Sequence, residues 1–145
     1  MNGYMNILVA VDGSSEAKRA FYKSIEVVKL EENARLHIVS VIDIFSIDED
    51  DTSYLEREEQ RIGDLLNSCK TLAKDKGIDD VETYIKHGDP KVSISKELAQ
   101  VIEADLIVCG AQGVKNAEHF FLGSVSEAIV LTASCDVLVV RGSVK

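Results

Sequence analysis

The sequence predicts a doubly wound α/β fold, in which a parallel sheet carries helices on both faces. Five short apolar runs alternate along the chain with four segments of helical periodicity, and this alternation is typical of parallel strands joined by crossover helices. The 145 residues suffice to bury one core without disulfides or metal, and no linker, repeat or low-complexity segment divides them. We therefore expect a single domain over residues 1–145, with right-handed crossovers.

The first strand and the first helix are predicted at the beginning of the chain. Residues 5–11 form an apolar run, and the turn-forming residues 12–14 follow it. From Ala17 to Val28 apolar side chains recur at helical spacing, so we expect a helix that packs by one face. A second apolar run, residues 36–42, predicts the second strand.

A long polar helix and a third strand are predicted in the middle of the chain. Ser53 and Glu56 form a capping box for a helix that reaches about Lys76, and Gly77 ends it. In residues 81–86 two sets of side chains alternate, which indicates a strand with one covered face. The less polar set consists of Val81, Thr83 and Ile85.

The last third of the chain continues the alternation of helices and strands. Asp89 as cap and Pro90 at the first helical position begin a helix that reaches about Glu103. The remaining elements are a fourth strand over residues 105–109, a helix over 124–132 and a fifth strand over 137–140.

The segment between the fourth strand and the last helix indicates a ligand. Gly110, Gly113 and Gly123 lie around a loop that opens into Ser124, which forms a capping box with Glu127. Backbone N–H groups at such a helix start attract phosphate, and glycine lets the backbone approach a ligand closely. We therefore expect this loop to hold the phosphates of a nucleotide. Turn glycines and a simple helix cap remain the alternative interpretation.

This Gly-x2-Gly-x9-Gly-Ser pattern resembles the ATP-binding branch of the universal stress protein family. In chain order, the matching segments are ILVAVDGSSEAKRAF, LHIVSVID, GDP, ADLIVCGAQG, FFLGSVSEAIV and VLVVR. The chain departs from the family at Gln112, where many members have histidine, and at Asp136, where proline is common. The resemblance implies a Rossmann-like sheet of the adenine nucleotide alpha hydrolase type, with strand order 3-2-1-4-5.

The topology of the sheet and the glycine pattern both indicate that the ligand lies at the same edge of this sheet. Open α/β sheets bind ligands beyond the carboxyl ends of their strands where the winding reverses, and there the first strand ends at Asp12 and the fourth at Gly110. By resemblance Asp12 serves the nucleotide, whereas by position alone it is a helix cap. The resemblance also implies that the backbone of Val41, otherwise a core residue, pairs with the adenine edge. The predicted site comprises Ala10, Val11, Asp12, Val41, Gly110, Gly113, Gly123, Ser124 and Val125.

The expected cofactors are ATP and Mg2+. A triphosphate in a protein of net charge -9 needs compensating charge, and the loop offers only Lys115 and His119. We therefore expect Mg2+ to share this role, with Asp12 as a metal ligand. His37 and His87 are expected to be structural or surface residues of the second and third strands.

Composition and charge disfavour other partners. The acidic balance opposes binding to duplex nucleic acid or an anionic membrane, and no apolar stretch approaches the roughly 20 residues that span a bilayer. No signal peptide is visible, so a cytoplasmic location is expected. Cys69, Cys109 and Cys135 lack the spacing of metal or redox motifs and are expected to be buried thiols.

The fifth strand is expected to join two copies of the chain. In the implied order the third and fifth strands are the edges of the sheet. Glu82 and Lys86 protect the third strand against chance pairing with another chain. The fifth strand carries an uncharged apolar run that would be an aggregation hazard if left open. We therefore expect a homodimer through residues 137–141, as the resemblance also implies.

The function that the resemblance implies is a nucleotide-dependent stress-response module, which we expect to be a homodimer. One alternative is a slow ATPase or nucleotidyl-transfer enzyme at the same site, with at most weak hydrolysis because the P-loop lysine and a poised arginine are missing from the pattern. The other alternative is a dimer that acts through protein contacts without a nucleotide.

Overall fold

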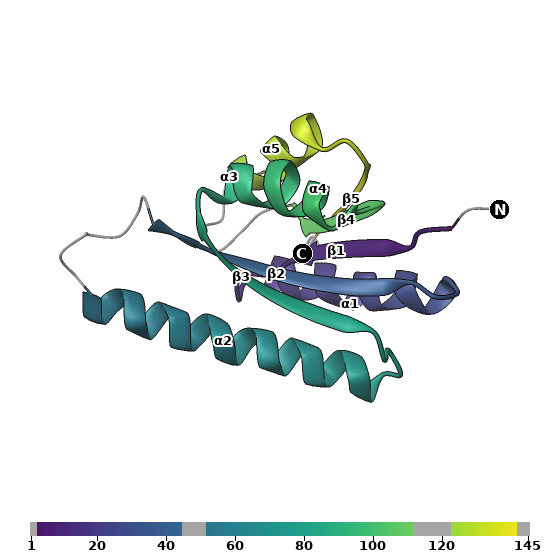
Figure 1. The fold of residues 1–145 in the computed structure, drawn as a ribbon, viewed down its shortest axis with the longest axis horizontal. Helices are drawn as coiled ribbons and strands as arrows, with labels where there is room; N and C mark the ends of the chain where they lie inside the picture. The colour runs from purple at the N-terminus through teal and green to yellow at the C-terminus, as the bar shows by residue number, and fades with distance from the viewer. Residues whose placement is uncertain (1–2, 45–51, 112–122, 142–145) are drawn as a thin grey trace.

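All described strands belong to one parallel sheet, whose order is β3-β2-β1-β4-β5 (Figure 1). The computed structural model describes residues 3–44, 52–111 and 123–141. The strands are β1 (Asn6–Ala10), β2 (Arg35–Asp43), β3 (Val81–Gly88), β4 (Leu106–Gly110) and β5 (Asp136–Val140). The doubly wound class and the strand order are confirmed, and the winding reverses between β1 and β4.

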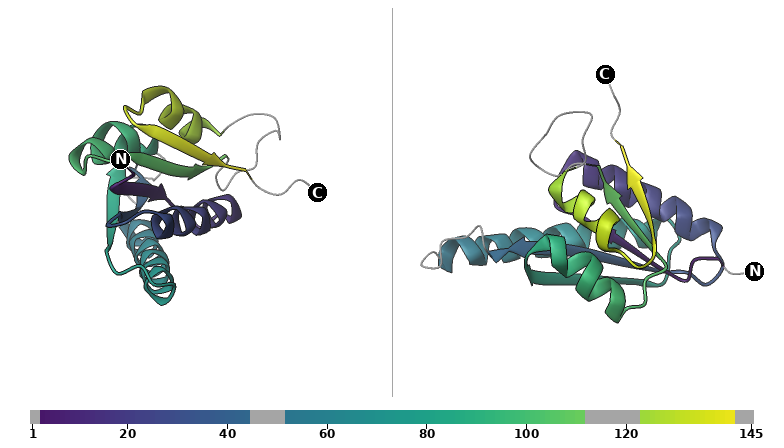
Figure 2. Two further views of the ribbon diagram at one scale, coloured as in Figure 1. Left: turned by 90° about the vertical axis from the view of Figure 1, so that its right-hand side faces the viewer. Right: turned by 90° about the horizontal axis from the view of Figure 1, so that it is seen from above.

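Helices cover both faces of the sheet, as Figures 1 and 2 show. On one face lie α1 (Ser15–Leu30) and the long α2 (Thr52–Asp75). The opposite face carries α3 (Pro90–Val92), the π-helical turn η2 (Ser93–Leu98), α4 (Ala99–Val101) and α5 (Ser124–Thr132). We call these the α1–α2 face and the α3–α5 face.

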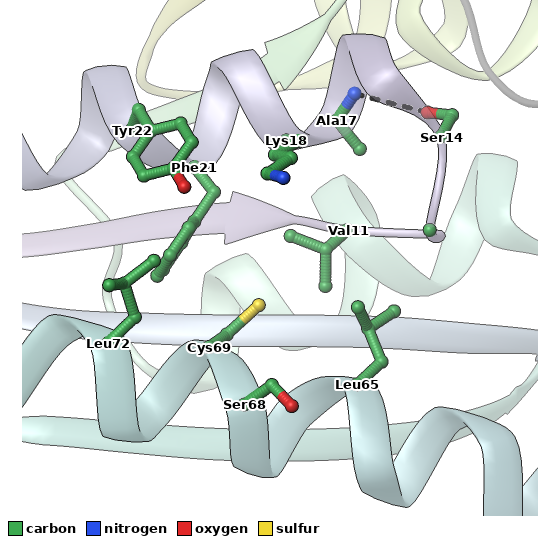
Figure 3. Close-up of a pocket in the computed structure, with 11 residues that line it drawn as sticks. Val11, Ser14, Ala17, Lys18, Phe21, Tyr22, Leu65, Ser68, Cys69 and Leu72 are labelled. Atoms are coloured by element: carbon green, nitrogen blue, oxygen red, sulfur yellow. Dashed lines mark hydrogen bonds between the residues drawn. The ribbon is translucent and has the colours of Figure 1, made fainter.

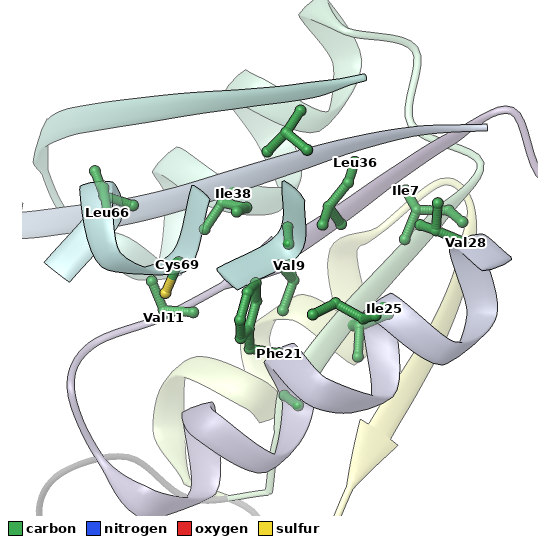
Figure 4. Close-up of a cluster of buried hydrophobic side chains, with 14 of the residues drawn as sticks. Ile7, Val9, Val11, Phe21, Ile25, Val28, Leu36, Ile38, Leu66 and Cys69 are labelled. Carbon is green, nitrogen blue, oxygen red and sulfur yellow. The ribbon is translucent and has the colours of Figure 1, made fainter. Parts of the chain in front are cut away.

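Each face has its own hydrophobic core, because successive residues of a strand point to opposite sides of the sheet. In β1, Ile7 and Val9 pack on the α1–α2 face together with Phe21 and Ile38 (Figure 4), whereas Leu8 packs on the α3–α5 face. All three β1 side chains are 0% exposed. Burial on both sides explains why this strand is apolar at every central position.

Expected helix boundaries are confirmed at Asp89-Pro90 and at Gly77, whereas α1 is capped by Ser14 and not by Asp12. Ser14 is the N-cap of α1, and its Oγ accepts a hydrogen bond from Ala17 N at 3.1 Å. Asp89 caps α3 in the same way, and Pro90 occupies the first helical position. Gly77 follows α2 with φ of +96°, a conformation that glycine adopts without strain.

The capping box expected at Ser124 is wrong. The N-cap of α5 is Gly123, which makes no side-chain cap, and Ser124 is already the first helical residue. Instead, the Oγ of Ser126 donates to Ala111 O at 2.8 Å and ties the first turn of α5 to the end of β4. A tertiary hydrogen bond thus replaces the local one that the sequence pattern favoured.

Other boundaries also differ from the expectations. α2 begins at Thr52, so Ser53 lies inside the helix rather than at its cap. The helix after Pro90 contains the π-helical turn and ends at Val101. In β3, Ile85 is 40% exposed and Tyr84 packs on the α3–α5 face, because an edge strand is covered by its neighbours only in part.

Candidate functional site

The predicted site lies at the carboxyl ends of β1 and β4, where the two strands are neighbours. Their register runs from Ile7 opposite Leu106 to Val9 opposite Val108. Beyond this point the chain leaves the sheet into α1 on one side and toward α5 on the other. The geometry therefore gathers the turn after β1, the end of β4 and the start of α5 at one edge of the sheet.

The turn after β1 is held by its own backbone and by Asp12. Val11 N donates to Val39 O at 2.9 Å, and Ser14 N donates to the Oδ1 of Asp12 at 2.9 Å. Gly13 follows with φ of +90°. Asp12 does not cap α1, because Ser14 does, and within the described residues its Oδ2 has no hydrogen-bond partner. One carboxylate oxygen thus remains open for a ligand.

The end of β2 presents open backbone groups beside this turn. β1 ends at Ala10, in register with Val39, while β2 continues to Asp43. Alternate residues of a parallel strand direct their N–H and C=O to the same side, so those of Val41 point the same way as those of Val39. They therefore point past the end of β1, where no described strand continues. A planar ring with a donor and an acceptor on one edge could pair there.

The apolar residues of the predicted site divide between the two faces. Ala10, Val41 and Val125 are partly buried against the core of the α3–α5 face, whereas Val11 is 5% exposed and packs on the α1–α2 face. The structure therefore brings three of the four together. The side chain of Val11 therefore points away from the other three apolar residues of the predicted site.

Gly110 is required by the fold itself. A Cβ at this position would lie 2.9 Å from the backbone oxygen of Glu16, in the first turn of α1. No side chain tolerates that distance to backbone, so the small residue permits β4 and α1 to approach each other. The sequence pattern assigned this glycine to a ligand, and close packing of the protein is a sufficient reason for it.

Both ends of the glycine loop meet at the start of α5. Gly123 N donates to Ala111 O at 2.7 Å, and Ala111 N donates to Val140 O at 3.0 Å. Ser124 and Val125 open a helix of nine residues, whose first N–H groups have no partner within a helix. Gly113, Lys115 and His119 lie outside the described residues, so the phosphate contacts expected of the loop stay predictions.

An arginine that the sequence analysis missed lies beside the turn after β1. Arg61 of α2 places its Nη1 3.2 Å from where a Cβ of Gly13 would be. Hydrogen bonds to Glu58 chiefly raise the pKa of Arg61, and the charges of Glu58, Tyr54 and Asp12 raise it further. Its Nε and Nη2 are held by Glu58 at 2.8 and 3.0 Å. The spacing of Glu58 and Arg61 in the sequence indicates that they share one helix face. No sequence pattern indicates that Arg61 lies near the turn after β1.

Glu16 adds a second acidic group to this edge. Its Oε2 is buried and has no hydrogen-bond partner among the described residues. A buried carboxylate oxygen without a donor is costly unless a cation or a donor reaches it. The described residues form no group of three or more potential metal ligands. A divalent ion at this edge would therefore also need oxygen atoms from a bound small molecule.

His37, Cys69 and Cys109 are buried inside the fold. His37 is 3% exposed, and its ring nitrogens contact Tyr84 Oη at 2.7 Å and Asn6 Oδ1 at 3.0 Å. Burial raises the pKa of the thiols of Cys69 and Cys109 to about 11, so both are neutral. Buried thiols are thus confirmed at these two positions, whereas Cys135 is only partly buried. No helix in the described ranges is long and apolar enough to cross a bilayer.

A family model, a relative in sequence and two solved structures all relate this chain to one protein family. The model of the universal stress protein family matches residues 3–141. A universal stress protein of Staphylococcus aureus strain USA300 is 47% identical over 141 residues, which are 95% of this chain and 84% of that protein. The structure of universal stress protein UspA from Lactobacillus plantarum has a TM-score of 0.88 and 28% identity, and the match covers 97% of this chain and 100% of that one. A universal stress protein in complex with cAMP has a TM-score of 0.76 and 27% identity, with 98% and 100% covered.

Proposed function

The chain belongs to the universal stress protein family, and we propose on this premise that it is an ATP-binding regulatory module. In this proposal ATP binds at the carboxyl ends of β1 and β4, and the bound nucleotide alters the conformation or the partners of a homodimer. The observation that carries it is the convergence of open backbone groups of β2, the Asp12 turn and the start of α5 at the edge where the winding reverses.

The base is assigned to the end of β2. The N–H and C=O of Val41 offer a donor and an acceptor in line with an adenine edge, and Ala10 supplies apolar surface for the ring. Support comes from the universal stress protein of similar fold that was solved with cAMP, which also carries an adenine. Asp12 then accepts a ribose hydroxyl or holds a metal ion through its open oxygen.

The phosphates are assigned to the start of α5. Unpaired N–H groups and the positive end of a helix dipole favour an anion there, beside Gly123 and Ser124. Asp12, Glu16 and Glu127 make this edge acidic, so a triphosphate needs a cation. Mg2+ is commonly held by one or two carboxylates together with phosphate oxygens, which suits Asp12. Arg61 supplies a further positive charge close to the turn.

The homodimer is assigned to the open edge of β5. Residues 137–140 are only partly buried in one copy of the chain, and their outer backbone groups have no described strand beside them. Antiparallel pairing with a second copy would satisfy these groups and cover the apolar side chains.

A variant at each sheet edge tests this dimer. Val139→Lys should give monomers in light scattering, because a charged side chain would replace part of the apolar surface of β5 that pairing is expected to cover. Ile85→Lys, at the exposed position of the opposite edge strand β3, is the matched control and should leave the dimer mass unchanged. A dimer that persists in Val139→Lys would reject the β5 interface.

Arg61 is the one observation that favours the enzyme alternative. A guanidinium near the phosphates can stabilise charge in phosphoryl transfer, so slow ATP hydrolysis is the second candidate function. It requires steady ADP release over many turnovers that disappears in Asp12→Ala. A single stoichiometric release, or release unchanged in this variant, would leave a binding protein.

The first experiment identifies the nucleotide directly. Freshly purified protein is denatured, and the released small molecules are separated by chromatography, while emptied protein is titrated calorimetrically with ATP and Mg2+. We expect bound adenine nucleotide or a micromolar affinity, and we expect Gly113→Val to lose it while keeping the circular dichroism of the fold. A protein that ignores adenine nucleotides would support the nucleotide-independent dimer instead.

A further inference from the structure

A pocket lies on the α1–α2 face, and Gly13 and Ser14 of the turn after β1 form part of its lining (Figure 3). It has a volume of about 320 Å³ and lies between the first half of α1 and the middle of α2. Only Val11 belongs both to its lining and to the predicted nucleotide residues. The volume is at the lower end of the range of small-molecule sites, about 300–1,000 Å³.

The interior of this pocket is apolar. Phe21, Cys69 and Val11 form its buried part, and they are 2%, 8% and 5% exposed. The pKa of the Cys69 thiol is raised to about 11 by burial, so this sulfur carries no charge at neutral pH. Leu65 and Leu72 of α2 complete the apolar wall, and Figure 3 shows their side chains directed toward α1.

Polar groups occur only at the mouth. Lys18 is the one charged residue of the lining, and among the described residues no carboxylate forms an ion pair with it. The Oγ of Ser14 already accepts from Ala17 N. The other two hydroxyls of the lining belong to Ser68 of α2 and Tyr22 of α1, and both residues are exposed. In a chain of net charge -9, an unpaired cation at the mouth of an apolar pocket attracts a negatively charged group.

The apolar interior disfavours a nucleobase, and these features together point to one class of ligand. The ring nitrogens of a base would be buried without partners in this interior, which is costly. A phosphate dianion is usually held by a guanidinium or several donors, whereas one lysine matches a single negative charge. We infer that the pocket binds a small amphipathic carboxylate, with its hydrocarbon body between α1 and α2 and its carboxylate at Lys18.

Calorimetric titration with octanoate, and with octanol as the uncharged analogue, tests this inference. Ser68→Trp places a large ring at the mouth and should weaken octanoate binding at least tenfold. Asn67→Trp is the matched control, because Asn67 is also exposed on α2 but is absent from the lining, and it should bind octanoate as the unmodified protein does. Equal affinity of the two tryptophan variants, or no octanoate binding by the unmodified protein, would overturn the inference.

A charge variant tests the position of the carboxylate. Lys18→Gln should weaken octanoate binding about fivefold, the size expected of a solvent-exposed ion pair, and should leave octanol binding unchanged. Lys29→Gln, near the other end of α1, should change neither. An identical response of octanoate and octanol to Lys18→Gln would refute the assignment. The side chains of Lys18 and Lys29 are both exposed, so we expect both glutamine variants to fold, and a change in affinity then reports on binding.

Discussion

The two faces of the sheet differ in how much of each is devoted to packing. The α1–α2 face is covered by helices of 16 and 24 residues that bury a continuous core, whereas on the α3–α5 face α5 has nine residues and buries only Ser126 and Ile129. Leu131 of α5 is 76% exposed. The thinly packed face holds the adenine and phosphate groups of the proposed site. The α1–α2 face thus supplies most of the apolar packing of the sheet, and the α3–α5 face carries a smaller core.

The largest expected effects come from truncating one isoleucine on each face. Ile38 and Ile129 are both 0% exposed, so each loses the same buried atoms on substitution by alanine. Ile38→Ala should lower the free energy of unfolding near the upper end of about 2–5 kcal/mol, and Ile129→Ala near the lower end, because the short α5 can shift to fill the cavity. Urea denaturation measures both. Equal losses would remove the proposed difference between the faces.

A methyl group at Gly110 tests the contact that links the site to α1. Gly110→Ala places a Cβ 2.9 Å from Glu16 O, so the first turn of α1 must move. We expect a loss of about 1–3 kcal/mol in the free energy of unfolding, as for other overpacked sites. Gly63→Ala is the control, since its Cβ would meet nothing within 4 Å and alanine favours the helix. Stability unchanged in Gly110→Ala would show that the contact relaxes freely.

Arg61 tests whether the α1–α2 face contributes to the nucleotide site. Arg61→Ala should weaken ATP binding about tenfold and adenosine binding little, because a charge-assisted contact acts only on the phosphates. Arg57→Ala, one turn earlier on the same helix, is the control. Calorimetry with ATP and adenosine gives both affinities. If ATP and adenosine weaken together, Arg61 acts through the fold rather than through the phosphates.

The smallest expected effect is a pH dependence from His37. Burial, followed by the charge of Arg35, lowers the pKa of His37 in the folded chain below its value in the unfolded chain. The unfolded state therefore binds more protons as the pH falls through the unfolded pKa of about 6.5, and stability falls with it. His37→Gln should flatten the change in melting temperature between neutral and mildly acidic pH. His87→Gln, on the exposed edge strand, serves as the comparison, and an equal slope in all three proteins would contradict this assignment.

Local patterns were sufficient for most elements of the fold. The five apolar runs became the five strands, and Gly77 and the pair Asp89-Pro90 marked helix ends where expected. These features depend on side-chain period and on backbone preferences within a few residues, so they are readable from the chain alone. The two capping boxes failed because the same residues also fit inside a first turn, and at α5 the bond from Ser126 to Ala111 decided the outcome.

The features of the candidate site also fall into those that follow from the sequence and those that depend on packing. The sequence by itself determined the fold class and the residues at the ends of β1 and β4, because an apolar run followed by turn residues specifies where a strand stops. Three further features depend on how the elements pack in space. Gly110 gives room to α1, Arg61 lies beside Gly13, and β2 extends beyond the end of β1 at Val41. The pocket between α1 and α2 likewise needed both helices in place. These features join residues far apart along the chain, and their distances depend on how the elements pack rather than on any local preference.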